Sequence, residues 1–320
     1  MAIEHARARL LPKPWGMADV QPWSNARHDD QRIGEIWYER AGAGSPNASL
    51  LLKLLFTDKP LSVQVHPDDG FAQALGLPRG KTEAWYVLSA APGAKVALGL
   101  NQYVTAHQLR ETASNGSITN LLAWRAVSPG DVLLVPAGTI HAIGAGLIIA
   151  ELQQNSDATF RLFDYGSERE LHIESAVAVA TAGPAEFQVR PTRVTEERTL
   201  LVSSPHFVLE KIDLPPNSRW RLEVDRETWI LALNGDAQTG SFDITTGDAV
   251  FAEADCLELD TGSTRFVGLV AHTGAGHAPE LLQVFKERTS GIRGSREESL
   301  PTPLVQGHAS TGTRLVETAR

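Results

Sequence analysis

The sequence predicts a mainly β protein built from two β-barrels. Three observations support this: short strand-like runs, turn signals between them, and a faint internal repeat. Over residues 1–98, short apolar runs alternate with Pro and Gly turn signals, a pattern typical of an all-β domain. Strand-like runs return at 131–135 and 147–153, and again between about 198 and 287. We therefore expect β structure in both halves of the chain.

Helical signals interrupt the strands at two places. Thr105 and Gln108 have the form of a capping box that opens a helix, and Ser117 begins a second short helix. Another helix is expected across Ile173–Ala182, just before a Gly-Pro pair. These segments predict a short helical insertion and a connecting helix on an otherwise β scaffold.

The second half of the chain repeats part of the first. Glu83-Ala-Trp-Tyr-Val-Leu is echoed by Glu227-Thr-Trp-Ile-Leu-Ala, and Gly130-Asp-Val-Leu-Leu is echoed by Gly247-Asp-Ala-Val-Phe. The two motifs lie farther apart in the first copy, and the helical stretch 99–125 roughly accounts for the difference. The repeat predicts two related barrels, the first decorated and the second plain.

The first copy carries four candidate ligands for one divalent metal ion, namely Gln64, His66, Glu83 and His141. Gln64 and His66 alternate along a strand-like stretch, so both side chains point to one face. His141 ends a run that reads as a turn, a short apolar strand and a second turn. Nitrogen and oxygen donors without thiolate suit Zn²⁺, but also Mn²⁺, Fe²⁺, Co²⁺ or Ni²⁺. Three strong ligands with an open position are typical of a catalytic metal site rather than a structural one.

These residues carry a resemblance to a known family. The spacing G-x5-P-x-G-x2-H and the pair Gln64-x-His66 followed by Glu83 resemble the two motifs of the cupin superfamily. Longer strings are similar to type I mannose-6-phosphate isomerases of the short bacterial form, over roughly residues 10–180: Leu61-Ser-Val-Gln-Val-His-Pro-Asp-Asp69, Gly80-Lys-Thr-Glu-Ala-Trp-Tyr-Val-Leu88, Val135-Pro-Ala-Gly-Thr-Ile-His-Ala-Ile-Gly144 and Glu151-Leu-Gln-Gln-Asn-Ser-Asp-Ala-Thr-Phe-Arg-Leu-Phe-Asp-Tyr165. The resemblance implies cupin-type jelly-roll barrels and one Zn²⁺ per chain. It also implies an aldose-ketose isomerase that interconverts D-mannose 6-phosphate and D-fructose 6-phosphate through a metal-assisted cis-enediol.

The second copy lacks the ligands, because Glu253-Ala-Asp-Cys-Leu-Glu258 stands where the first copy has Pro136-Ala-Gly-Thr-Ile-His141. Only the first barrel is therefore expected to bind metal. The expected parts are a metal-binding catalytic barrel over 1–98 and 126–170, a helical insertion over 99–125, a helical linker over 171–197, a second metal-free cupin-like barrel over 198–287, and a polar tail over 288–320.

Three further residues are candidates for the catalytic site. Lys81 lies two residues before Glu83, so in a strand both would face the pocket; the alternative is a solvated lysine at a turn. Ser156-Asp157-Ala-Thr-Phe-Arg161 resembles a stretch whose two charged residues belong to the family's active site. The alternative is a surface Asp–Arg pair. A planar guanidinium suits two-point contact with phosphate or with neighbouring sugar oxygens. Lys81, Asp157 and a metal-bound hydroxide all remain possible as the proton-shuttling base.

The charge balance limits the classes of partner. A net charge of −9 argues against nucleic acid or an anionic membrane as a partner, and the family resemblance implies a small-molecule sugar phosphate instead. A sugar phosphate needs local positive charge, which the metal, Lys81 and Arg161 can supply. The single cysteine, Cys256, and the lack of an evident signal peptide or of a roughly 20-residue apolar run predict a cytoplasmic protein. No pattern indicates the oligomeric state.

Two alternatives stay open from the sequence. One is a metal-dependent cupin isomerase or epimerase that acts on another sugar phosphate. The other is a non-catalytic regulatory paralogue that binds a sugar phosphate, although such a protein needs binding and not the whole set of ligands and charged residues.

Overall fold

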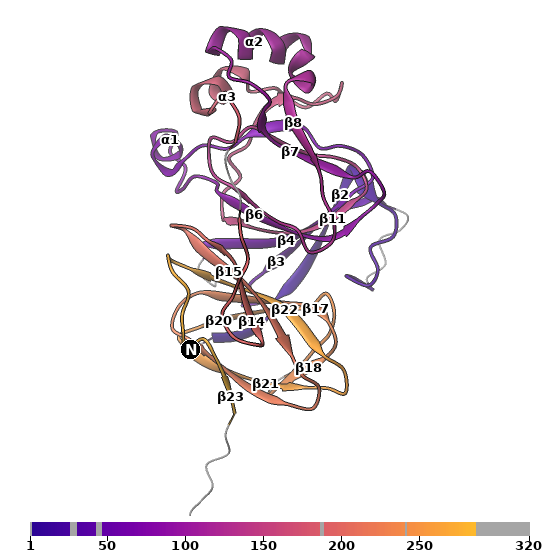
Figure 1. Ribbon diagram of the computed structural model, residues 1–320, viewed down its shortest axis with the longest axis vertical. Coiled ribbons are helices and arrows are strands. Elements are labelled where there is room, and N and C mark those ends of the chain that lie inside the picture. The colour runs from indigo at the N-terminus through magenta and orange to yellow at the C-terminus, as the bar shows by residue number, and fades with distance from the viewer. Residues whose placement is uncertain (1, 26–30, 43–46, 186–188, 241, 286–320) are drawn as a thin grey trace, which may run out of the picture. The chain divides into compact units, whose positions relative to one another are not determined.

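Four antiparallel β-sheets and three short α-helices form the described part of the chain in the computed structural model (Figure 1). The structure describes residues 2–25, 31–42, 47–185, 189–240 and 242–285, and the polar tail predicted over 288–320 lies outside them. The predicted mainly β fold class is confirmed. None of the helices in these ranges is long and apolar enough to cross a membrane.

The first half of the chain supplies two sheets. One has six strands in the order β2, β3, β4, β11, β6 and β9, which are Arg7–Met17, Ile33–Glu39, Leu50–Thr57, Leu147–Gln154, Glu83–Ala90 and Val132–Val135. The other has five strands in the order β12, β5, β10, β7 and β8, which are Phe160–Phe163, Val63–Val65, His141–Ile143, Lys95–Leu100 and Leu122–Ala126.

The second half supplies the other two sheets, together with the first strand of the chain. The seven-stranded sheet runs in the order β1, β20, β17, β22, β15, β14 and β13, which are Ala2–His5, Ala249–Glu253, Thr228–Asn234, Phe266–Thr273, Phe207–Leu214, Arg198–Ser203 and Thr192–Arg193. The second five-stranded sheet runs in the order β19, β18, β21, β16 and β23, which are Phe242–Ile244, Ala237–Thr239, Asp255–Thr261, Arg219–Val224 and Leu282–Val284.

The helices are short and belong to the first half: α1, α2 and α3 are Asp69–Ala74, Ala106–Asn115 and Ile173–Val179, and a 3₁₀ turn follows at Ser117–Asn120. The capping box predicted for Thr105 and Gln108 is confirmed, because each side chain accepts a hydrogen bond from the other residue's backbone N–H. Helices α2 and α3 pack against each other beside the first five-stranded sheet (Figure 1).

Three apolar cores separate the four sheets. The first lies between the first five-stranded sheet and the six-stranded sheet, the second between the six-stranded and seven-stranded sheets, and the third between the seven-stranded sheet and the last one. The six-stranded sheet is therefore covered on both faces, and its central strand β4 is buried along its whole length. Such a strand reads as an almost continuous apolar run, and Lys53 is the charged exception in Leu50–Thr57.

The internal repeat has a structural counterpart. Gly130 and Gly247 precede β9 and β20 with φ of 92° and 93°, a left-handed conformation that favours glycine. The residue after each glycine, Asp131 or Asp248, accepts a hydrogen bond from a backbone N–H three residues upstream, 2.8 Å long in both cases. Two copies of one strand–turn–strand unit thus lie in the two halves. The division of the chain into two barrels at the predicted boundaries remains a proposal.

Candidate metal centre

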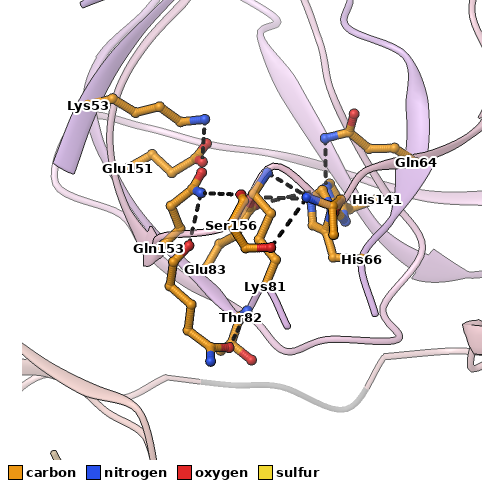
Figure 2. Close-up of polar contacts among 12 residues, drawn as sticks. Lys53, Gln64, His66, Lys81, Thr82, Glu83, His141, Glu151, Gln153 and Ser156 are labelled. Atoms are coloured by element: carbon orange, nitrogen blue, oxygen red, sulfur yellow. Dashed lines mark hydrogen bonds and ion pairs between the residues drawn. The ribbon is translucent and has the colours of Figure 1, made fainter. Parts of the chain in front are cut away.

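Two histidines and one glutamate form a buried cluster between the first two sheets. Ligand atoms of His66, Glu83 and His141 all lie within 4.8 Å of one another, and each side chain is 1% exposed. His66 follows β5 directly, whereas Glu83 and His141 are the first residues of β6 and β10. Three segments that are distant in the sequence therefore bring these donors together, as Figure 2 shows. A group of this composition could hold a metal ion.

The hydrogen bonds of the two imidazoles fix which nitrogen faces the cluster. His66 Nδ1 lies 2.8 Å from the carbonyl oxygen of Ala158, and His141 Nδ1 lies 2.9 Å from that of Thr139. A carbonyl can only accept, so both Nδ1 atoms carry the proton and both Nε2 atoms keep their lone pair. Metal-binding histidines commonly donate their other N–H in this way. The donor set is therefore already oriented for a metal.

The electrostatics keep the donors in the ligating form. Burial and the Lys81 ammonium lower the pKa of His66 to about 3, and burial also lowers the pKa of His141. Burial opposes ionisation of Glu83, but the Lys81 ammonium outweighs it and holds the pKa of this carboxyl well below its usual value. At neutral pH the cluster therefore holds two neutral imidazoles and one carboxylate, the forms that bind metal.

Gln64 lies at the edge of this cluster, as the sequence predicts. It pairs with His141 across β5 and β10, and its Nε2 lies 3.2 Å from His141 Nε2 while its Oε1 accepts a hydrogen bond from Ser62 Oγ. Metal ligation requires the amide oxygen instead of the nitrogen. A rotation of the amide by a half turn places Oε1 toward the histidines and lets Nε2 donate to Ser62 Oγ.

Lys81 is buried beside the cluster and is not a solvated lysine. Its Nζ lies 2.8 Å from Glu83 Oε1 and 3.4 Å from His66 Nε2. Lys81 lies in the loop before β6 and not in the strand, so it reaches Glu83 from this loop. Lys81 therefore provides a positive charge directly next to the candidate ligands.

Asp157 and Arg161 line the pocket that Glu83 and Gln64 also line. Asp157 is exposed, and among the described residues no ion pair joins it to Arg161. Arg161 lies on β12 opposite Gln64, and its Nε is buried without a hydrogen-bond partner among the described residues. Burial and the nearby Arg169 lower the pKa of Arg161, so this cation is placed to gain from an anionic or hydroxylic partner.

The pocket also contains polar residues that were not predicted from the sequence. They extend from the cluster across the six-stranded sheet: Glu35, Lys53, Glu151 and Gln153. Lys53 Nζ lies 2.9 Å from Glu151 Oε1 (Figure 2). A sequence signal for Lys53 was available, because it is the only charged residue in an apolar strand. Trp15 and Trp37 line the pocket too, and Trp15 also packs in the adjacent core.

The pKa values of Glu151 and Lys53 are both raised. Burial, followed by the negative charge of Glu83, raises the pKa of Glu151 to about 7. Burial disfavours the charged form of Lys53, but Glu151, Glu35 and Glu83 outweigh it and raise the pKa of this lysine. A carboxyl that titrates near neutral pH thus lies next to a lysine that stays charged, which is suitable for moving protons.

Comparison with known proteins finds similar sequences in one class of enzyme. No family model matches the chain. It is 40% identical over 176 residues to mannose-6-phosphate isomerase of Streptococcus mutans, a match that covers 51% of this chain and 54% of that relative. It is also 41% identical over 160 residues to a probable mannose-6-phosphate isomerase of Bacillus subtilis, covering 47% and 50% of the two chains. The chain thus spans about half the length of the curated relatives it matches.

A solved structure has a similar fold over most of this chain. The mannose 6-phosphate isomerase from Bacillus subtilis superposes with a TM-score of 0.74 at 24% identity, covering 85% of this chain and 100% of that one. The predicted resemblance is confirmed. The chain is similar in sequence to mannose-6-phosphate isomerases over about half its length, and it shares their fold over 85% of its length.

Proposed function

We propose that this protein interconverts D-mannose 6-phosphate and D-fructose 6-phosphate. The observation that carries the proposal is the buried His66–Glu83–His141 cluster, in which both Nε2 atoms and the carboxylate face one point. Relatives at 40% and 41% identity are named as isomerases of this sugar phosphate. The pocket that Glu83 and Gln64 line also supplies cations and titratable groups for an anionic sugar.

We propose that His66, Glu83 and His141 hold one divalent metal ion, with Gln64 as the fourth ligand after rotation of its amide. Zn²⁺ suits nitrogen and oxygen donors, and a structural neighbour with a TM-score of 0.66 at 14% identity is described as zinc-bound. A bound divalent ion supplies Lewis-acid stabilisation of the negative charge that develops on the sugar oxygens.

The residues of the chain supply the proton transfer. Isomerisation removes the proton on C2 of the open-chain aldose and returns a proton to C1, so it needs a base with a pKa near neutral. Glu151 meets this requirement, because its pKa is raised to about 7 and it lines the pocket. Lys53 stays charged 2.9 Å from Glu151 and can balance the charge that appears when Glu151 loses its proton. Lys81 and Asp157 remain alternative bases in this proposal.

Binding of the anionic substrate falls to the cations of the pocket. Lys13, Lys53, Lys81, Arg161 and Arg169 line it, whereas the whole chain carries a net charge of −9. Arg169 donates two hydrogen bonds to Asp164, and Lys81 is close to Glu83. Arg161 has a buried Nε without such a partner, so we assign it to contact with a substrate oxygen.

The direct test is an assay of the purified protein with mannose 6-phosphate, coupled to detection of fructose 6-phosphate. Turnover supports the proposal. Binding without turnover favours a regulatory sugar-phosphate-binding protein, and the absence of both favours another substrate.

A second assay tests the role of the metal. Chelator-treated protein is expected to lose the isomerase activity and to regain it on addition of Zn²⁺. Full activity of the metal-free protein contradicts the metal-centred part of the proposal.

A further inference from the structure

Gln153 is a buried glutamine in the wall of the active-site pocket. It lies on β11 directly opposite Glu83 of β6, and its side chain is 1% exposed. Opposite residues on neighbouring antiparallel strands have Cβ atoms about 5 Å apart, so Gln153 is an immediate neighbour of the candidate metal ligand. It lines the same pocket as Glu83 and Lys81.

Two hydrogen bonds fix the orientation of the Gln153 amide. Its Nε2 donates to the main-chain oxygens of Gln154 and Ser156, each at 3.0 Å (Figure 2). The opposite orientation places Oε1 against two carbonyl oxygens, which repel it and offer no proton. The amide oxygen is therefore held in one direction by the protein itself.

This fixed oxygen has no hydrogen-bond donor among the described residues. A buried acceptor without a donor is unfavourable, so such groups in binding sites mark places where a ligand supplies the missing partner. A carbonyl-type oxygen accepts from a hydroxyl and is repelled by the oxygens of a phosphate group. The missing partner is thus a hydroxyl of the sugar and not the phosphate.

We infer that Gln153 Oε1 accepts a hydrogen bond from a hydroxyl on C3 or C4 of the sugar phosphate and thereby contributes to substrate selection. The inference rests on the proposed function, in which the cluster with Glu83 takes the reacting carbons C1 and C2. Because Gln153 lies beside Glu83 in the sheet, the hydroxyls next along the sugar are those within its reach.

The neighbouring residue provides a matched control. Gln154 is also buried, but its Oε1 accepts from Thr82 N and its Nε2 donates to Asp69 Oδ1, both at 2.9 Å. Gln154 points to the other side of the strand and does not line the pocket. Both its amide oxygen and its amide nitrogen therefore have a partner within the protein.

The test compares Gln153→Met with Gln154→Met on mannose 6-phosphate and on its 3-deoxy and 4-deoxy analogues. For Gln153→Met we expect kcat/KM for mannose 6-phosphate to fall by about 3- to 10-fold, mainly through KM, the size of one neutral hydrogen bond. For one of the two deoxy analogues, the variant and wild type are expected to have the same kcat/KM, because the bond is already absent. Gln154→Met is expected to lower thermal stability without changing the ratios between substrates.

Each outcome decides a separate point. The inference is overturned if Gln153→Met loses kcat/KM equally on all three substrates, or if Gln154→Met shows the same selective loss. Gln153 then has a structural role. Wild-type protein that does not turn over mannose 6-phosphate contradicts the proposed function and the substrate named here. If the wild type is active but the ratio of Gln153→Met to wild-type kcat/KM is the same for all three substrates, only the Gln153 inference is contradicted. If Gln153→Met does not fold, Gln153→Asn, which retracts the same amide by one methylene, is measured in its place.

Discussion

Glu83 and Glu227 occupy equivalent positions in the two halves of the molecule and have different roles. Both are buried, and each accepts a hydrogen bond from the indole Nε1 two residues later, Trp85 at 3.2 Å and Trp229 at 3.1 Å. Glu83 faces two histidines and Lys81. Glu227 instead accepts hydrogen bonds from the backbone N–H groups of Ser49 and Leu50, at 2.6 and 2.8 Å.

The difference shows that the same strand geometry occurs with and without the candidate metal ligands. The same Glu-x-Trp unit places a carboxylate inside each half, and the residues around it decide what it binds. In the first half the partners are the other candidate ligands and a cation. In the second half they are Leu50, the first residue of β4, and Ser49 just before it, so Glu227 joins the second half to the strand that carries Lys53. The second half therefore stabilises the sheet on which the pocket is built.

The strongest test of the comparison exchanges the two carboxylates for amides. Glu83→Gln removes the negatively charged candidate ligand, and because a catalytic metal supplies several kcal/mol, we expect kcat/KM to fall by more than about 1,000-fold. Glu227→Gln is expected to change kcat/KM by no more than about threefold, because its partners are two backbone N–H groups and the Trp229 indole, none of which lines the pocket. Steady-state kinetics with mannose 6-phosphate measure both. Equal losses in the two variants contradict the separation of roles.

The next largest effect concerns the pH dependence of stability in the first half. Glu151 has its pKa raised from 4.5 to about 7, so the folded protein keeps a proton that the unfolded chain releases. The contribution of this proton to the free energy of unfolding is fully present below pH 4.5. It is lost as the pH rises through about 7, which lowers the free energy of unfolding by about 3 kcal/mol. Glu151→Gln removes it. Urea unfolding of metal-free protein at pH 5 and pH 8 is expected to show the variant gaining stability over the wild type at the higher pH. A pH-independent difference contradicts the raised pKa.

Lys81 sharpens the comparison because its counterpart in the second half is an exposed acid. Asp225 stands two residues before Glu227, as Lys81 stands two residues before Glu83. Lys81→Met is expected to lower kcat by about 100-fold, within the range for groups that assist proton transfer or stabilise charge. Asp225→Asn serves as the control and is expected to leave kcat unchanged. Comparable kcat values for Lys81→Met and the wild type argue that Lys81 is structural.

The smallest expected effect is on the stability of the join between the halves. Glu227→Gln leaves one buried backbone N–H facing an amide NH₂, a loss of about 2 kcal/mol in the free energy of unfolding. Tyr38→Phe removes one hydrogen bond of 2.8 Å to Gly247 O across the same join and is expected to lose about 1 kcal/mol. Chemical unfolding monitored by tryptophan fluorescence compares the two. A Glu227→Gln protein as stable as the wild type contradicts the role of this carboxylate.

Much of the β scaffold and the metal cluster was predictable, because both follow from local patterns. Strand alternation placed Gln64 and His66 on one face, and turn signals placed His141 after a short apolar strand and a turn, although His141 begins the next strand, β10, and does not end one. Glu151, Gln153 and Lys53 were missed because their importance depends on strands that pair across the sheet. The contact of Glu227 with Ser49 joins residues 178 positions apart, and no local pattern encodes it. The predicted sequence repeat nevertheless led to the comparison between Glu83 and Glu227.

The central claim is that the buried cluster holds one catalytic metal ion and that only the first half does so. A Zn²⁺ titration of chelator-treated protein, with bound metal and isomerase activity followed together, tests it most directly. We predict that one equivalent binds per chain, that activity rises in proportion, and that the His66→Ala, His141→Ala double variant shows neither response. Full activity without metal, or unchanged binding by the double variant, contradicts the claim.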